Sequence, residues 1–189
     1  LYTAPWPGQG FYTKFPVNSV SDFKGKKLRI YSTATQQMGS MLGFNATILP
    51  FAEIPQAFST GLIEALFTSP QTGIDIQAWD NTKHFTYAGA IFSKNAVVVT
   101  KKAFNALSKG DQSNMLAAAK KAELRGWEMS AETTKKQIGI LKKNGMSSKN
   151  APDEVISKMK SIGLEMMKNW RSKASPEANA VLDRYLSMR

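Results

Sequence analysis

The fold of this chain is decided by residues 22–70, which open with Asp22-Phe23-Lys24-Gly25-Lys26-Lys27-Leu28-Arg29-Ile30. Gly25 ends a short turn, and basic side chains then alternate with Leu28 and Ile30, the period-two pattern of a short strand. Arg29 would lie near the carboxyl end of that strand. There its planar guanidinium could hold a carboxylate through two parallel hydrogen bonds, at the sheet edge where open α/β folds bind ligands. The alternative is a surface arginine that is solvated or paired with an acid.

Four more elements follow in quick succession and indicate an α/β fold. We expect a helix over 33–42, a strand over 45–49, a helix over 52–60 and a strand over 62–67. Ser32 or Thr33 would cap the first helix, and Gly43 would end it. The N-terminus of this helix, beside Arg29, would direct free N–H groups at the same anion.

The last of these strands ends in Phe67-Thr68-Ser69-Pro70. Small polar groups before a proline suit a loop that faces a cleft, where Thr68 and Ser69 could donate hydrogen bonds to an oxygen-rich ligand. Equally, they could only cap the next helix, expected over 71–80.

The order of short motifs in this region resembles the TRAP-transporter solute-binding receptors, the dicarboxylate-receptor family. Gly25 to Arg29 follows the family pattern Gly-x-Lys-x-Arg, Pro50-Phe51-Ala52-Glu53 follows Pro-Phe-x-Glu, and Ala57 to Gly61 follows Ala-Leu-x-Thr-Gly. Two departures concern the ligand: Glu64-Ala65 replace the usual Asp-Gly, and Thr68-Ser69 stand where some members carry an asparagine before proline.

The resemblance implies a receptor that binds a small organic acid through Arg29 and delivers it to membrane permease subunits. It implies a ligand-binding site made by Arg29, Ser32, Thr33, Phe67, Thr68 and Ser69, joined by Trp6 and Gln9 from the extended opening segment. It also implies a periplasmic location and a missing N-terminal part of roughly 100 or more residues, since family members have two lobes.

The implied fold is α/β: one periplasmic-binding-protein-like lobe of the class II type, with a long bridging helix and a helical C-terminal tail. We expect a ligand-facing lobe over 1–94, a strand returning toward the other lobe plus the bridging helix over 95–145, and C-terminal helices over 146–189. Residues 95–100 form a β-branched run that predicts a buried strand. Ser108 would begin a helix of about 30 residues, some 45 Å long, and Pro152 and Ser175-Pro176 would begin two more.

The charge distribution leaves a different class of function open. The formal net charge is +11, and residues 101–189 carry most of the excess as scattered lysine pairs. A basic, helix-rich module that binds an anionic partner is therefore the alternative reading. No aromatic side chains are interleaved with the lysines to form a stacking platform, so we expect no nucleic-acid partner.

The sequence offers no set of catalytic or metal-binding residues. His84 is the only histidine and there is no cysteine, so no cluster has metal-ligand spacing. No nucleophile elbow or phosphate-binding glycine loop is present. We therefore expect no enzyme and no cofactor.

Overall fold

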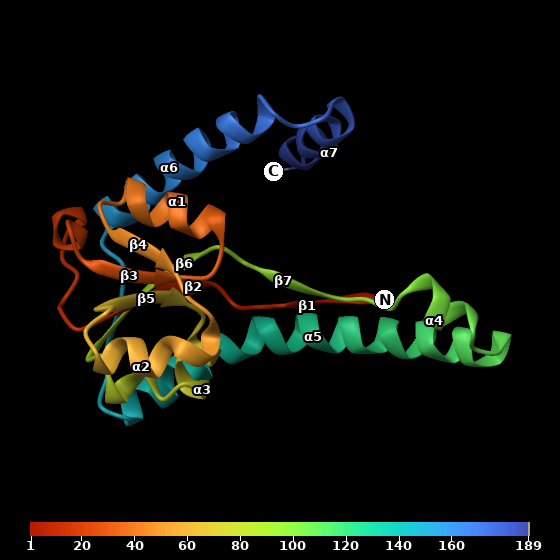
Figure 1. Ribbon diagram of the computed structural model, residues 1–189, viewed down its shortest axis with the longest axis horizontal. Coiled ribbons are helices and arrows are strands. Elements are labelled where there is room, and N and C mark those ends of the chain that lie inside the picture. Colours follow the sequence, from red (N-terminus) through yellow and green to blue (C-terminus); the bar gives the residue numbers. More distant parts are fainter. Residues whose placement is uncertain (189) are drawn as a thin grey trace.

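The computed structural model describes residues 1–188, apart from the side chain of Ala131. Its centre is a sheet of six strands (Figure 1). In order of pairing these are β4 (Asn45–Ile48), β3 (Lys27–Ile30), β5 (Ala65–Thr68), β2 (Gln9–Thr13), β6 (His84–Ala90) and β8 (Ser147–Asn150). Only β2 runs opposite to its neighbours, so the other five strands end at the same edge.

Helices cover both faces of this sheet (Figure 1). One face carries α1 (Thr33–Met41) and α6 (Asp153–Arg171), and the other carries α2 (Ile54–Ser59), α3 (Pro70–Asp75) and the end of α5 (Lys109–Lys143). Short 3₁₀ helices lie at Val20–Phe23, Phe51–Glu53 and Ala78–Asp80. The lobe is thus a three-layer α/β/α sandwich, as expected from the alternating elements.

Alternation along β2 supplies both halves of the core. Phe11 faces α1 and α6, where it packs among Phe23, Phe44 and Phe67, with the Phe11 and Phe67 ring centroids 4.8 Å apart. Its neighbour Tyr12 points to the opposite face, among Phe58, Phe85 and Leu141. Successive side chains on a strand point to opposite faces, so this one strand anchors two hydrophobic layers.

An arm extends from the lobe (Figure 1). It is built from a two-stranded antiparallel ribbon of β1 (Tyr2–Pro5) and β7 (Lys94–Val97), the short α4 (Lys101–Asn105) and the first part of α5. Helix α5 has 35 residues, about 52 Å of helix. Above the arm, α6 leads to α7 (Pro176–Leu186), which completes an overhang.

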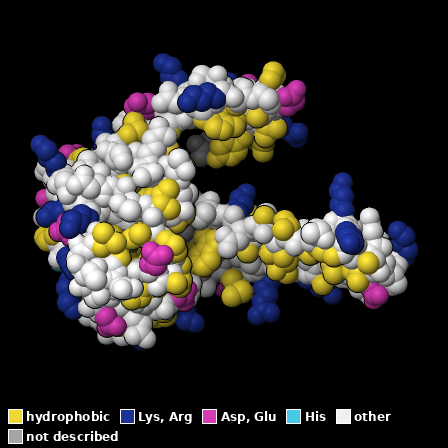
Figure 2. All heavy atoms as spheres, viewed as in Figure 1, with side chains coloured by type: hydrophobic (Ala, Val, Ile, Leu, Met, Phe, Trp, Pro, Cys, Tyr) yellow, Lys and Arg dark blue, Asp and Glu magenta, His cyan; other side chains and the backbone are white. Residues whose placement is uncertain are grey.

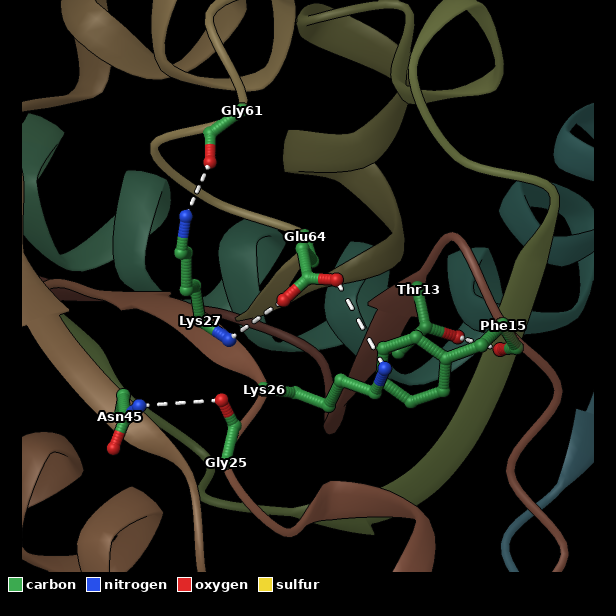
Figure 3. A network of polar contacts seen from close by, with 8 residues as sticks. All are labelled: Thr13, Phe15, Gly25, Lys26, Lys27, Asn45, Gly61 and Glu64. Atoms are coloured by element: carbon green, nitrogen blue, oxygen red, sulfur yellow. Dashed lines mark hydrogen bonds and ion pairs between the residues drawn. The ribbon is translucent and has the colours of Figure 1, made fainter.

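Polar contacts fix the beginning of β3 against its neighbours (Figure 3). The Lys27 backbone donates to a Glu64 carboxylate oxygen at 3.2 Å, and its ammonium donates to the Gly61 carbonyl at 3.0 Å. On the other side, the Asn45 amide donates to the Gly25 carbonyl at 3.2 Å. These bonds join the starts of β4, β3 and β5, so the register that places Arg29 is set from the opposite end of the strand.

Most predicted local elements are confirmed. The strand carrying Arg29, the helix that follows it, the helix begun by Ser108 and the final helix begun by Ser175 all occur within a residue or two of the predicted bounds. The domain divisions at residues 94 and 145 stay predictions. Among residues 1–188, no helix has the length and apolar character that crossing a bilayer requires.

The strand predicted over 95–100 occurs in part, as β7 (Lys94–Val97), but its predicted burial is wrong. Strand β7 pairs only with β1 in the arm, and Val98, which follows it, is 79% exposed. The β-branched side chains indicated a strand, but burial depends on what packs against it. Strands β6 and β8 were not predicted from the sequence.

Candidate functional site

A polar pocket of about 340 Å³ opens at the sheet edge where β3 and β5 end. Arg29 lies in β3 and Tyr31 directly follows it. Thr68 ends β5, Ser69 follows it, and Thr72 lies in the first turn of α3. Three further segments complete the lining: Trp6 and Gln9, Phe51, and Ser93 to Asn95. Strand ends and loops thus converge here, the usual position of a ligand site in an open α/β sheet.

Arg29 is the cation of this pocket with the least contact with water. Its side chain is 4% exposed, and its Nε donates to the Leu49 carbonyl at 3.0 Å. Among the described residues 1–188, no carboxylate pairs with it. Burial lowers the pKa of Arg29 below its ordinary value, because desolvation disfavours the charged form. A buried, unpaired guanidinium is costly, and an anion in the pocket would relieve that cost.

Tyr31 connects the arginine to the opening segment. The guanidinium carbon of Arg29 lies 6.0 Å from the centre of the Tyr31 ring. The Tyr31 hydroxyl accepts from Gln9 Nε2 at 2.8 Å and donates to Gln9 Oε1 at 3.0 Å. Gln9 Nε2 also donates to the Ser93 hydroxyl at 3.1 Å. Burial raises the pKa of Tyr31, so the phenol stays protonated and able to donate at neutral pH.

The loop after β5 both caps a helix and lines the pocket, so the two roles considered for this loop occur at once. Ser69 Oγ accepts from the Thr72 backbone at 3.2 Å, which caps α3, and lies 3.1 Å from the Thr72 hydroxyl. The Ser69 carbonyl accepts from the fully buried Tyr12 hydroxyl at 3.2 Å. The loop is therefore held in place by the core beneath it.

The structure brings together five of the predicted site residues and places three elsewhere. Arg29, Gln9, Trp6, Thr68 and Ser69 line one pocket. Phe67 has no exposed surface and supports the pocket from within the core. Ser32 caps α1, as predicted, but lines a neighbouring groove, and Thr33 is exposed outside the pocket.

Several residues that line the pocket were not predicted from the sequence, above all Tyr31, Thr72, Ser93, Lys94 and Asn95. The period-two pattern that selects Arg29 also places Tyr31 on the same side of the chain, so Tyr31 could have been found. Ser93 to Asn95 enter only because the chain folds back to form β7 beside β1. No local pattern signals that return.

The groove that receives Ser32 is larger and mainly apolar. It has a volume of about 620 Å³ and lies between α1, α6 and the end of β6. Tyr31 and Ser93 form the wall that it shares with the polar pocket. Within residues 1–188, no group of His, Cys, Asp or Glu side chains could hold a metal ion.

The comparison with known families assigns a class to this fold and pocket. Residues 8–173 match the family described as bacterial extracellular solute-binding protein, family 7. The chain belongs to this family, whose members are solute-binding receptors of TRAP transporters and not enzymes. The family is extracytoplasmic, as the predicted periplasmic location requires. Membership of this family favours a solute receptor over the alternative of a basic module that binds an anionic partner.

Three solved structures resemble this chain over nearly its whole length. DctP7 of Bordetella pertussis, an extracytoplasmic solute receptor binding pyroglutamic acid, is 40% identical with a TM-score of 0.94. DctP6 of the same organism, also a receptor binding pyroglutamic acid, is 35% identical with a TM-score of 0.94. A marine metagenome TRAP solute-binding protein specific for pyroglutamate is 33% identical with a TM-score of 0.92.

The match is unequal in length. The three alignments cover 97%, 99% and 98% of this chain, but only 61%, 62% and 61% of the respective relatives. This chain therefore spans somewhat less than two thirds of each relative's length.

Proposed function

We propose that this chain is the carboxylate-binding lobe of a TRAP-type receptor that passes a small organic acid to membrane permease subunits. The observation that carries the proposal is Arg29: a buried guanidinium, without a carboxylate partner among residues 1–188, on the wall of a polar pocket. A guanidinium has five N–H donors, and the Leu49 carbonyl takes one of them. The remaining donors suit a carboxylate held by two parallel bonds.

The ligand we propose is a small cyclic acid of the pyroglutamate kind. Three relatives at 33–40% identity bind pyroglutamate or pyroglutamic acid. Such a ligand carries a carboxylate for Arg29, together with a ring carbonyl and a ring N–H. Thr68, Thr72 and Asn95 line the same pocket and offer hydroxyl and amide groups to these ring atoms. A pocket of about 340 Å³ lies in the lower range for small-molecule sites.

The remaining partner we propose is further polypeptide of the same receptor, seated over the open side of the arm. Exposed apolar residues lie along the arm and overhang, among them Val98, Leu124, Trp127, Val181 and Met188. Figure 2 shows hydrophobic side chains gathered along the arm and on the side of the overhang that faces it. Patches of this kind mark interfaces, and the additional third or more of each relative's length supplies an occupant.

Replacing Arg29 tests the clamp. We expect Arg29→Ala in the complete receptor to weaken L-pyroglutamate binding at least tenfold in calorimetry, because a charge-assisted pair is lost. The fold should persist, because removal of a buried unpaired charge offsets part of the cost of losing the bond to Leu49. Arg125→Ala, which removes an exposed arginine of α5 outside the pocket, is the matched control and should bind as the parent does. Unchanged binding by Arg29→Ala would overturn the clamp.

A further inference from the structure

Both connections between the arm ribbon and the sheet pass through the wall of the ligand pocket. The first connection is Trp6 to Gly8, between β1 and β2, and the second is Ile91 to Ser93, between β6 and β7. They are joined to each other, because the Trp6 backbone donates to the Ser93 carbonyl at 2.9 Å. Trp6 and Ser93 line the same pocket as Arg29. A change in ribbon direction would therefore change the dimensions of that pocket.

The backbone is irregular at both connections. Gly89 has φ of +59° and Ile91 has φ of +54°, and a β-branched residue adopts such values only under constraint. On the other side, the pairing of β2 with β6 shifts register between Gln9 and Gly10. Bulges and positive-φ positions redirect a strand. The ribbon thus leaves the sheet at two adjacent bends.

Beyond these bends, the ribbon is fastened to α5. Glu123 accepts from the Thr3 backbone at 3.0 Å and from the Thr3 hydroxyl at 2.7 Å. The Lys94 ammonium lies 5.3 Å from the centre of the Trp127 ring. These contacts tie each ribbon strand to the same helix, so the ribbon and this part of α5 move together.

One side-chain network joins the two bends to the anion site. Gln9 sits at the bulge, bonded to Ser93 at the second bend and to Tyr31, whose ring packs beside the Arg29 guanidinium. Gln9 is 2% exposed, so little water competes for these bonds.

We propose that Gln9, Tyr31 and Ser93 act as positioning residues that couple occupancy of the anion site to the direction of the ribbon. The inference rests on the proposed carboxylate clamp at Arg29. A ligand gains its best contacts to Arg29 and Thr68 on the sheet, and to Ser93 and Asn95 on the ribbon side, at one ribbon angle. The network is complete at that angle, so binding and ribbon direction stabilise each other. Tyr31 carries the link because it contacts both the guanidinium and the Gln9 amide.

The experiment compares Tyr31→Phe with Tyr87→Phe in the complete receptor. Each change removes one phenol hydroxyl, from the residue after β3 in Tyr31→Phe and from β6 in Tyr87→Phe. The Tyr87 hydroxyl has no hydrogen-bond partner among residues 1–188 and lies outside the polar pocket. L-Pyroglutamate affinity is measured by calorimetry, and the radius of gyration is measured by small-angle scattering without ligand and at saturating ligand.

We expect Tyr31→Phe to weaken binding about fivefold to tenfold and to lose most of the ligand-induced change in radius of gyration. Tyr87→Phe should keep both. Normal affinity in Tyr31→Phe, or weaker affinity with an intact change in radius, would overturn the coupling. The clamp itself is judged separately: if Arg29→Ala binds normally, the proposed function fails, whereas loss in Arg29→Ala with no effect in Tyr31→Phe overturns only this inference.

Discussion

Gly73 shows how a residue without a side chain maintains the pocket. It lies in α3 against the fully buried Tyr12, and a Cβ at this position would overlap the Tyr12 hydroxyl. That hydroxyl donates to the Ser69 carbonyl and so fixes the loop that lines the pocket. Because Gly73 has no Cβ, the Tyr12 ring has room to place its hydroxyl against the Ser69 carbonyl.

Gly73→Ala should therefore lower the free energy of unfolding by about 1–3 kcal/mol, because a packed core resists added atoms. Ligand affinity should fall as well, since the Ser69 loop must move. Gly139→Ala in α5 is the control: apart from the chain neighbours and the nearby backbone of its own helix, nothing lies within 4 Å of where a Cβ would stand, so that change should stabilise the helix by about 0.5–1 kcal/mol. Urea denaturation measures both, and equal stability of the two variants would contradict the argument.

At the scale of residues, the sequence predicts what local patterns determine. Arg29 follows from strand alternation after a turn, and Ser69 follows from its place before a proline. Lys94 and Asn95 reach the pocket through long-range ribbon pairing, which has no local signal. Ser32 and Thr33 illustrate the opposite error: the helix that they begin was predicted, but its N-terminus faces the apolar groove.

The attachment of β1 to α5 depends on one carboxylate, that of Glu123. Hydrogen bonds from the Thr3 hydroxyl and backbone lower the pKa of Glu123. A carboxyl whose pKa is lower in the folded state stabilises the fold above its unfolded pKa, and this contribution is lost as the pH falls through the folded value. The attachment of the ribbon should therefore weaken in acid.

Melting curves of the chain and of Glu123→Ala test this statement. The variant should melt at a lower temperature at pH 7, because the two bonds to Thr3 are lost. The difference should shrink as the pH falls from about 5 toward 3, where the parent carboxyl also takes up a proton. Glu128→Ala, which removes an exposed carboxylate from the same helix, is the control. A difference in melting temperature that stays constant with pH would contradict this role of Glu123.

Elements differ in how far the sequence specifies them. Helices α5 and α7 begin at serines whose hydroxyls cap them, so their starts are local events. Strand β8 contains only Ser147-Ser148-Lys149-Asn150, a polar run with no strand signature, and exists because β6 offers a free edge. Strand β7 has the expected propensity without the expected burial, since propensity does not identify a covering partner.

Large apolar side chains are exposed on both the arm and the overhang. Val98 and Met188 are 79% and 76% exposed, and Trp127 and Leu124 are also exposed on α5. The order of motifs predicts the receptor class and hence a partner for this surface. It does not predict the ligand, because the walls of the pocket come from segments scattered along the chain.

The 189-residue chain alone should bind a hydrophobic dye such as anilinonaphthalene sulfonate several-fold more strongly than the complete receptor does. In the chain alone, the double variant Val181→Ser/Met188→Ser should reduce the dye signal, since both side chains lie on the exposed overhang. Ser161→Ala on α6 adds no large apolar group and serves as the control. Equal dye binding by the chain and the receptor would show that this surface is not covered.

The parallel pairing of β6 with β8 also delays completion of the sheet during protein synthesis. His84 and Ser147 are register partners, yet roughly 60 residues, most of them in the arm and α5, lie between them. At about 5–20 residues per second, a ribosome needs some 3–12 seconds to make that interval. During this time β6 has one unpaired edge, and α6, which follows β8 and covers the Phe11 core, is not yet made. A nascent chain of this lobe therefore remains open to proteases and chaperones until both β8 and α6 emerge.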